Sequence, residues 1–123
     1  MTSTDQLVTA IIDGIQEKKG VNITLLNLKK IDNAVASCFI LCTGTSDTHL
    51  DSISQSIEHV VEETLDQHVW NREGKTNKEW ILLDYSDVVV HIFRKETREK
   101  YNLENLWGDA ETIHISEQEE QSL

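Results

Sequence analysis

Three polar stretches of the chain contain residue types that are used in phosphate chemistry and in acid–base catalysis. Gly44-Thr45-Ser46 stands between an apolar segment and a helical pattern, and backbone N–H groups at the start of a helix can hold a phosphate. Asp84 and Asp87 offer carboxylates that could bind Mg²⁺, and His91 follows them closely. These residues raise two hypotheses: nucleotidyl or phosphoryl transfer, and general acid–base catalysis.

The spacing of these residues disfavours both hypotheses. The turn at Gly44 has no Walker lysine and no fuller glycine motif after it. Nucleotidyl transfer requires two carboxylates at alternate positions of a following strand, whereas here a helix follows, and Asp84 and Asp87 are three residues apart across a turn. His91 has no evident nucleophile beside it, which favours a strand histidine with a hydrogen-bond partner. We therefore expect no enzymatic activity, no catalytic residue and no cofactor.

Cys38 and Cys42 lie four residues apart in an apolar segment, which places them on the same side of a strand. A zinc site would need two further ligands, and the sequence has neither a second cysteine pair nor a clustered histidine pair. We expect both cysteines to be small buried hydrophobic residues, and we expect no metal site.

Four aromatic residues, Trp80, Tyr85, Tyr101 and Trp107, suggest binding rather than catalysis. A place in the core is the default for each of them. However, Trp80 follows charged residues 78–79, and Trp107 stands at the start of an acidic C-terminal stretch. Aromatic side chains flanked by carboxylates suit a surface that binds a basic partner. Both interpretations stay open from the residues alone.

The formal net charge of −11 over 123 residues is the largest signal in the composition. So acidic a chain repels phosphate backbones, which argues against nucleic acid as the main contact, although the charge could also serve solubility alone. No apolar run reaches the roughly 18 residues of a membrane span, and the N-terminus lacks a signal pattern. We expect one cytoplasmic domain that does not contact a membrane.

The stretch WILLDYSDVVVHIF, residues 80–93, organises the predicted fold. Apolar residues fill both of its phases, and the polar residues 84–87 interrupt it, as in two central strands joined by a tight turn. The pattern elsewhere predicts a helix after a capping box at Ser3, strands over residues 21–28 and 37–42, a long helix from Ser46 or Asp47, and a short helix over residues 94–100.

This order, α-β-β-α-β-β-α, predicts an α/β domain with a mixed β-sheet flanked by helices. Short connections favour antiparallel pairing within each pair of strands, and the long helix between the pairs allows a crossover. Residues 112–115 could add an edge strand, and a short strand could begin at residues 69–70. Residues 116–123 are expected to be disordered.

Several motifs stand out along the chain: Glu73-Gly74, residues 80–93, Thr97-Arg98, Tyr101, Leu103-Glu104-Asn105-Leu106-Trp107, Gly44-Thr45-Ser46 and His49. Together they closely resemble the ribosomal silencing factor family, also called RsfS or Iojap. The similarity spans roughly residues 5–110. One departure is Ser86, where glycine is expected, and a strained backbone angle there would cost about 1 kcal/mol.

The resemblance implies a non-enzymatic repressor of translation in the cytoplasm. Members of the family bind the large ribosomal subunit at its protein fourteen (uL14) and block subunit joining when nutrients fall. The implied fold resembles a nucleotidyltransferase core without its catalytic carboxylates, over residues 1–110, followed by a largely disordered acidic tail, residues 111–123. The implied protein is a monomer or a homodimer. Two alternatives stay open, a degenerate nucleotide-binding enzyme and an acidic adaptor unrelated to ribosomes.

The resemblance also implies a contact site. Its centre is Trp80, Asp84, Tyr85 and Asp87, and the outer members are His91, Tyr101 and Trp107.

Overall fold

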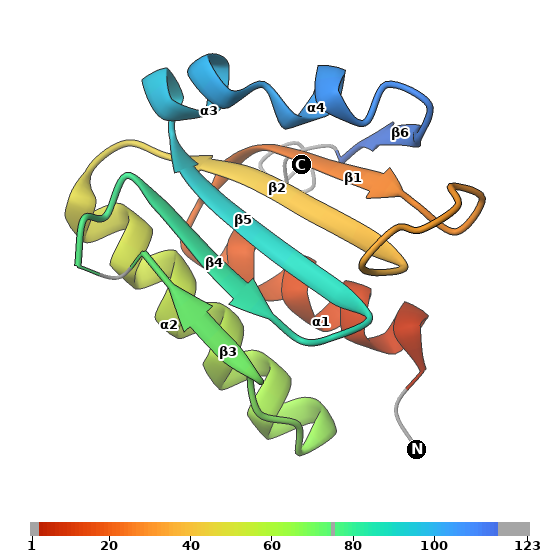
Figure 1. Cartoon of the computed structure of the whole chain (residues 1–123). Coiled ribbons are helices and arrows are strands. Elements are labelled where there is room, and N and C mark those ends of the chain that lie inside the picture. Colours follow the sequence, from red (N-terminus) through yellow and green to blue (C-terminus); the bar gives the residue numbers. More distant parts are fainter. Residues whose placement is uncertain (1–2, 75, 116–123) are drawn as a thin grey trace, which may run out of the picture.

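A six-stranded mixed β-sheet forms the centre of the molecule (Figure 1). The structure, a computed structural model, describes residues 3–74 and 76–115. The strands are β1 (Val21–Asn27), β2 (Cys38–Gly44), β3 (Asn71–Glu73), β4 (Trp80–Asp84), β5 (Val88–Arg94) and β6 (Glu111–His114), and they lie in the order β3-β4-β5-β2-β1-β6. The helices are α1 (Thr4–Glu17), α2 (Asp47–Leu65), α3 (Lys95–Tyr101) and α4 (Leu103–Leu106).

The pairing of the strands confirms the predicted α/β fold with a mixed sheet. β1 pairs antiparallel with β2, and β4 pairs antiparallel with β5, as the short connections predict. β2 and β5 pair in parallel along their whole length at the middle of the sheet, from Cys38 opposite Val88 to Gly44 opposite Arg94. The connection from β2 to this parallel neighbour runs through α2, which is the expected crossover.

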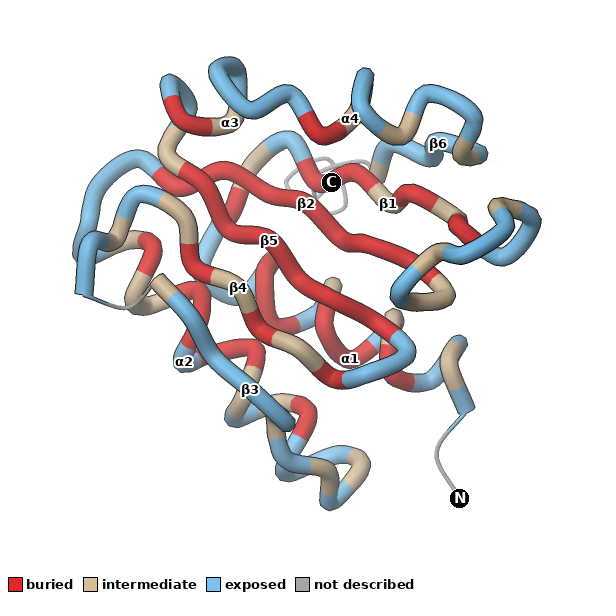
Figure 2. The backbone as a smooth tube through the Cα atoms, viewed as in Figure 1, coloured by how far each residue is buried: buried red, intermediate tan, exposed pale blue. Residues whose placement is uncertain are grey.

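The helices form two unequal layers. α1 and α2 pack on one face of the sheet, whereas α3 and α4 lie on the other side (Figure 1). β2 and β5 are buried almost throughout, because both of their faces are covered (Figure 2). One apolar cluster, with Ile40, Ile57 and Val90, fills the space beneath α1 and α2. A second, with Phe39, Phe93 and Leu103, lies beneath α3 and α4.

The helix ends follow the predicted local chemistry. Ser3 and Gln6 form a capping box at the start of α1, since each side chain bonds the backbone N–H of the other residue. Ser46 caps α2 by accepting a hydrogen bond from the backbone N–H of His49. The two helices therefore begin where the sequence predicts.

The two edge strands differ from the prediction in position. The short strand expected at residues 69–70 is β3, which begins at Asn71. The possible strand at 112–115 is β6, which begins at Glu111 and pairs with β1. The sheet therefore extends past the domain boundary expected after Ala110, because residues 111–114 bond to a strand of the core. The expected disorder of residues 116–123 lies outside the described part of the chain.

Candidate partner-binding face

The pleat of β4 and β5 places alternate side chains on opposite faces of the sheet. Ile81 and Val90 point into the cluster beneath α1 and α2. Trp80 and Phe93, which are opposite each other in the register, belong to the cluster beneath α3 and α4. His91 lies beside them, with its ring 5.8 Å from that of Trp80 and 6.0 Å from that of Phe93. The hairpin thus supplies three neighbouring rings to one face.

Three further rings extend this group into an aromatic layer. The ring of Tyr101, at the end of α3, lies 4.9 Å from that of Trp80. Phe39 of β2 contacts the rings of His91 at 4.7 Å and Trp107 at 5.7 Å, both in edge-to-face geometry. The aromatic layer consists of Phe39, Trp80, His91, Phe93, Tyr101 and Trp107.

The outer part of this aromatic layer is open to solvent. Tyr101 is 50% exposed, and Leu106 of α4, five residues further along the chain, is 70% exposed. Trp80 and Trp107 are half-buried, whereas Phe39 and Phe93 are buried. An apolar rim of this kind on a rigid sheet is typical of a surface that binds another protein.

His91 orients Trp80 within the layer. The indole N–H of Trp80 donates a 3.0 Å hydrogen bond to Nδ1 of His91, so the neutral ring carries its proton on Nε2. Burial lowers the pKa of His91 to about 4, which keeps the imidazole neutral near pH 7. The predicted hydrogen-bonded strand histidine is therefore confirmed, and its partner is a tryptophan rather than an aspartate.

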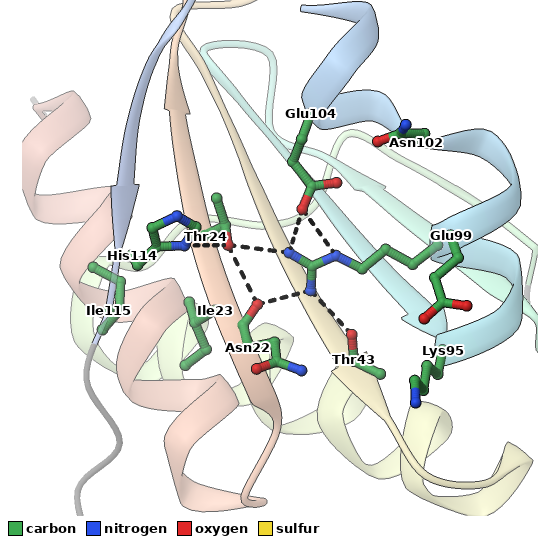
Figure 3. A pocket seen from close by; sticks show the side chains of 11 residues that line it. Asn22, Ile23, Thr24, Thr43, Lys95, Glu99, Asn102, Glu104, His114 and Ile115 are labelled. Carbon is green, nitrogen blue, oxygen red and sulfur yellow. Dashed lines mark hydrogen bonds and ion pairs between the residues drawn. The ribbon is translucent and has the colours of Figure 1, made fainter. Parts of the chain in front are cut away.

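Arg98 fastens α3 and α4 to the sheet, and its partners Asn22, Thr24, Thr43 and Glu104 are labelled in Figure 3. Its Nη1 donates to the backbone oxygen of Asn22 at 2.7 Å and to the hydroxyl of Thr43 at 3.0 Å. Its Nη2 donates to the hydroxyl of Thr24 at 3.0 Å, and both Nη2 and Nε donate to the carboxylate of Glu104, at 2.8 and 3.2 Å. Every N–H group of the guanidinium is engaged, so this residue is a structural tie beside a cavity of about 600 Å³.

The turn at Gly44-Thr45-Ser46 also makes its hydrogen bonds inside the protein. The backbone N–H of Thr45 donates to Nδ1 of His49 at 2.9 Å, and Nε2 of His49 donates to the backbone oxygen of Lys18 at 2.6 Å. These bonds, with the cap by Ser46, join the start of α2 to the end of α1. They leave fewer backbone donors for a phosphate, which weakens the nucleotide-binding alternative.

The two cysteines are buried and free, as predicted. Both lie in the cluster beneath α1 and α2. Burial raises the pKa of Cys38 to about 11 and that of Cys42 to about 12, so both thiols stay protonated. Within residues 3–74 and 76–115, no three histidine, cysteine or acidic side chains gather as metal ligands would. In the same residues, no helix has the length and apolar character required to cross a bilayer.

Comparison with known proteins identifies the family. A sequence model of the family described as "Ribosomal silencing factor during starvation" matches residues 1–123. The chain belongs to the ribosomal silencing factor family. Among its relatives, the ribosomal silencing factor of Halalkalibacterium halodurans is 34% identical over 113 residues, which cover 92% of this chain and 95% of the relative. That of Bacillus subtilis is 40% identical over 94 residues, 76% of this chain and 78% of the relative.

A solved structure and a more distant relative extend the comparison. A crystal structure of a Chromobacterium violaceum protein has a TM-score of 0.81 and 27% identity, and covers 87% of this chain and 88% of that one. A mouse protein, named for mitochondrial assembly of the ribosomal large subunit, is 33% identical over 76 residues, 56% of this chain and 31% of its own. Translation regulation and the large ribosomal subunit are therefore the functional context of the family.

The structure of this silencing factor divides the residues expected at the contact site. Trp80, His91, Tyr101 and Trp107 all belong to the aromatic layer. Tyr85 does not, because its side chain is 3% exposed and packs in the cluster beneath α1 and α2. The alternation of the pleat turns it away from Trp80. His91 is also buried, at 4% exposure, so the side chains of both Tyr85 and His91 lie beneath the surface.

The two aspartates of the turn retain a surface position. Oδ1 of Asp84 accepts a 2.7 Å hydrogen bond from the backbone N–H of Ser86, which stabilises the turn. Asp87 is exposed, and its Oδ2 accepts a 3.3 Å hydrogen bond from the hydroxyl of Thr4. Ser86 has a φ of 76°, a left-handed backbone angle that favours glycine.

Sequence reasoning missed three members of this region of the silencing factor. Phe39 was assigned only to a strand, although it links His91 to Trp107. Leu106 lay in a family motif without a role, and its 70% exposure shows a surface position. Arg98 also lay in a motif without a role. An arginine amid an otherwise helical, charged segment carried no signal, since its partners are distant in sequence.

Proposed function

We propose that this chain binds the free large ribosomal subunit through the exposed rim of its aromatic layer and thereby hinders subunit joining. The contact on the ribosome is protein fourteen of the large subunit. The chain acts as a cytoplasmic translation repressor under nutrient limitation, without catalysis. The family membership supports the ribosomal context, and the observation that carries the binding site is the solvent-exposed apolar rim on a rigid sheet.

The residues of this rim suit a protein partner. Tyr101 and Leu106 present apolar area at the surface, and the half-buried Trp80 packs against the ring of Tyr101. Rigid aromatic side chains lose little conformational entropy on binding, which makes them effective anchors. The hydrogen bond from Trp80 to His91 restricts the indole further. The rim is therefore preorganised for contact.

The charge of the chain supports a basic partner. With a net charge of −11, the chain is attracted to a basic ribosomal protein and repelled by the rRNA phosphates around it. Asp84 lies on the same face of β4 as Trp80, four residues or about 13 Å along the strand. Asp87 follows in the exposed turn. These carboxylates are placed to orient a partner that the rim anchors.

Blocking by such a complex would be steric. A 14.1 kDa domain seated on the joining face of the large subunit occupies space that the small subunit requires. No group on the chain needs to react, and the neutral His91 and protonated thiols fit that role.

Co-sedimentation with purified large subunits tests the proposal, followed by light scattering as small subunits are added. Wild-type protein should pellet with large subunits and lower the extent of joining. Tyr101→Ala should weaken binding by about 2 kcal/mol, as an interface anchor does, while Tyr101→Phe retains the ring and most of the affinity. Asp87→Lys should weaken binding by a similar amount if the partner of Asp87 is a desolvated cation. Asp13→Lys reverses the charge of another exposed aspartate, on α1, and provides the matched control.

Two outcomes separate the function from the site. A folded wild-type protein that leaves subunit joining unchanged would contradict the proposed function. Binding that is normal in both Tyr101→Ala and Asp87→Lys would retain the function and reject the rim as its site. A circular dichroism spectrum of each variant checks the fold.

A further inference from the structure

A second exposed aromatic side chain lies outside the aromatic layer, in the connection between α2 and β3. Trp70 is 77% exposed, the same fraction as Val35 and more than Tyr101 or Leu106. Its backbone is held in place, because its N–H donates a 2.8 Å hydrogen bond to the oxygen of Asp84. A tryptophan on a fixed backbone at the surface has lost part of the freedom that a binding event would otherwise remove.

A small cavity lies beside Trp70. Its volume is about 300 Å³, and its walls are Gln67, His68, Trp70, Tyr85 and Ser86. The cavity joins the end of α2 to the turn of the β4–β5 hairpin. Its size admits a side chain with a short piece of backbone rather than a folded domain.

Tyr85 lines this cavity, and its hydroxyl group is an unpaired donor. The side chain is 3% exposed, and its oxygen has no hydrogen-bond partner among the described residues. Native proteins rarely bury a polar group without a partner, because the lost hydration is not replaced. Burial raises the pKa of Tyr85, so the hydroxyl keeps its proton and remains a donor. An acceptor from a bound molecule would satisfy it.

The charges around the cavity are mainly negative. Arg72 is the nearby cation, and its guanidinium is held by Glu58 through hydrogen bonds of 2.8 and 2.7 Å. His68 lies 3.3 Å from Glu62. Further carboxylates are next to wall residues in the sequence, since Asp66 precedes Gln67 and Asp87 follows Ser86. This surface therefore attracts cations and repels nucleic acid.

From these observations we propose that the Trp70 cavity binds an extended basic polypeptide segment. An arginine or lysine side chain of the segment stacks on the Trp70 indole, and a backbone carbonyl of the segment accepts the hydrogen bond of the Tyr85 hydroxyl. The neighbouring carboxylates balance the positive charge. The surface is distinct from the rim around Tyr101, so it holds whether or not the rim binds the ribosome.

The test uses the full chain and a short synthetic peptide of alternating arginine and glycine. The ¹⁵N spectrum gives one indole signal for each of the three tryptophans, and Trp70→Phe assigns that of Trp70. The peptide should shift the Trp70 signal in a saturable way, with smaller changes at Trp80 and Trp107. A peptide with glutamate in place of arginine should shift none of them. A main shift at Trp107 would overturn the proposal.

Two variants test the two contacts. Trp70→Ala should weaken peptide binding by roughly fivefold or more, because the cation loses its ring. Tyr85→Phe should leave the melting temperature unchanged or raised, since the hydroxyl has no partner in the free protein, and weaken binding by about threefold. Unchanged affinity in Trp70→Ala would overturn the proposal. So would a Tyr85→Phe protein that melts lower but binds normally, because the hydroxyl would then be structural.

A second copy of this chain is the competing occupant, and sedimentation velocity distinguishes it. A monomer at micromolar concentration with and without the Trp70→Ala change agrees with the peptide proposal. A wild-type dimer that the Trp70→Ala change dissociates would overturn it.

Discussion

Replacing Arg98 by methionine should destabilise the chain by about 3 kcal/mol. The change keeps most of the apolar stem and removes the guanidinium. The side chain of Arg98 is 11% exposed, and its partner Glu104 is 31% exposed. The structure therefore predicts that the loss comes from hydrogen bonds and charge rather than from packing.

The predicted loss of stability is estimated from the polar groups that lose a hydrogen bond when Arg98 is replaced. The hydroxyls of Thr24 and Thr43 are 1% and 6% exposed, and each loses a hydrogen bond worth about 1 kcal/mol. The carboxylate of Glu104 loses two charge-assisted bonds, but the adjoining cavity of about 600 Å³ lets water replace part of them, which leaves roughly 1 kcal/mol. For a domain of this size the sum corresponds to a fall of roughly 10 °C in melting temperature.

Urea unfolding followed by circular dichroism measures the free energy, and Arg94→Met is the matched control. Arg94 also pairs with a carboxylate, at 2.9 Å from Asp47, but the two side chains are 36% and 59% exposed. An exposed pair of this kind contributes less than about 1 kcal/mol. Hydrogen exchange should also rise first in α3 and α4 of Arg98→Met. Equal losses in the two variants would refute the assignment of Arg98 as a structural tie.

Two further predictions concern the hairpin. Because the pKa of His91 is lowered from 6.5 to about 4 in the folded chain, the unfolded chain binds a proton more readily as the pH falls. The free energy of unfolding should therefore decrease by on the order of 3 kcal/mol from pH 7 to pH 4. His91→Leu should reduce this dependence on pH, as measured by urea unfolding at each pH. Ser86→Gly should stabilise the chain by about 0.5–1 kcal/mol because the φ of 76° strains a serine, whereas Ser86→Ala should not stabilise it. A thermal midpoint that is lower in Ser86→Gly than in wild type would contradict backbone strain at this position.

The hairpin and the long helix could be predicted because their signals are local. Residues 80–93 carry both strands and the turn in one uninterrupted pattern, and Ser46 supplies the cap of α2 within its own segment. The strained backbone angle at Ser86 was predicted from the resemblance to the family and not from the local pattern. Where a residue's partners lie within a few positions, sequence and structure agree.

The composition of the candidate site was predictable only in part. Tyr85 stands five residues after Trp80, and an odd separation along a strand places side chains on opposite faces, so the pleat could have excluded it. No such rule was available for Arg98. Its partners at positions 22, 24, 43 and 104 meet only after β1, β2 and α4 have assembled around it. Tertiary contacts of this kind leave no periodic trace in one sequence.

The two outermost strands limit how this sheet can associate. β2 and β5, the most apolar strands, lie in the middle, where each pairs with a neighbouring strand on both sides. The strands left at the borders are β3, three residues with an arginine and a glutamate, and β6, four residues beginning with a glutamate. Short charged borders are poor templates for the addition of a foreign strand, and like charges on neighbouring molecules oppose it further. The fold therefore keeps its most apolar strands away from both borders at which a foreign strand could pair.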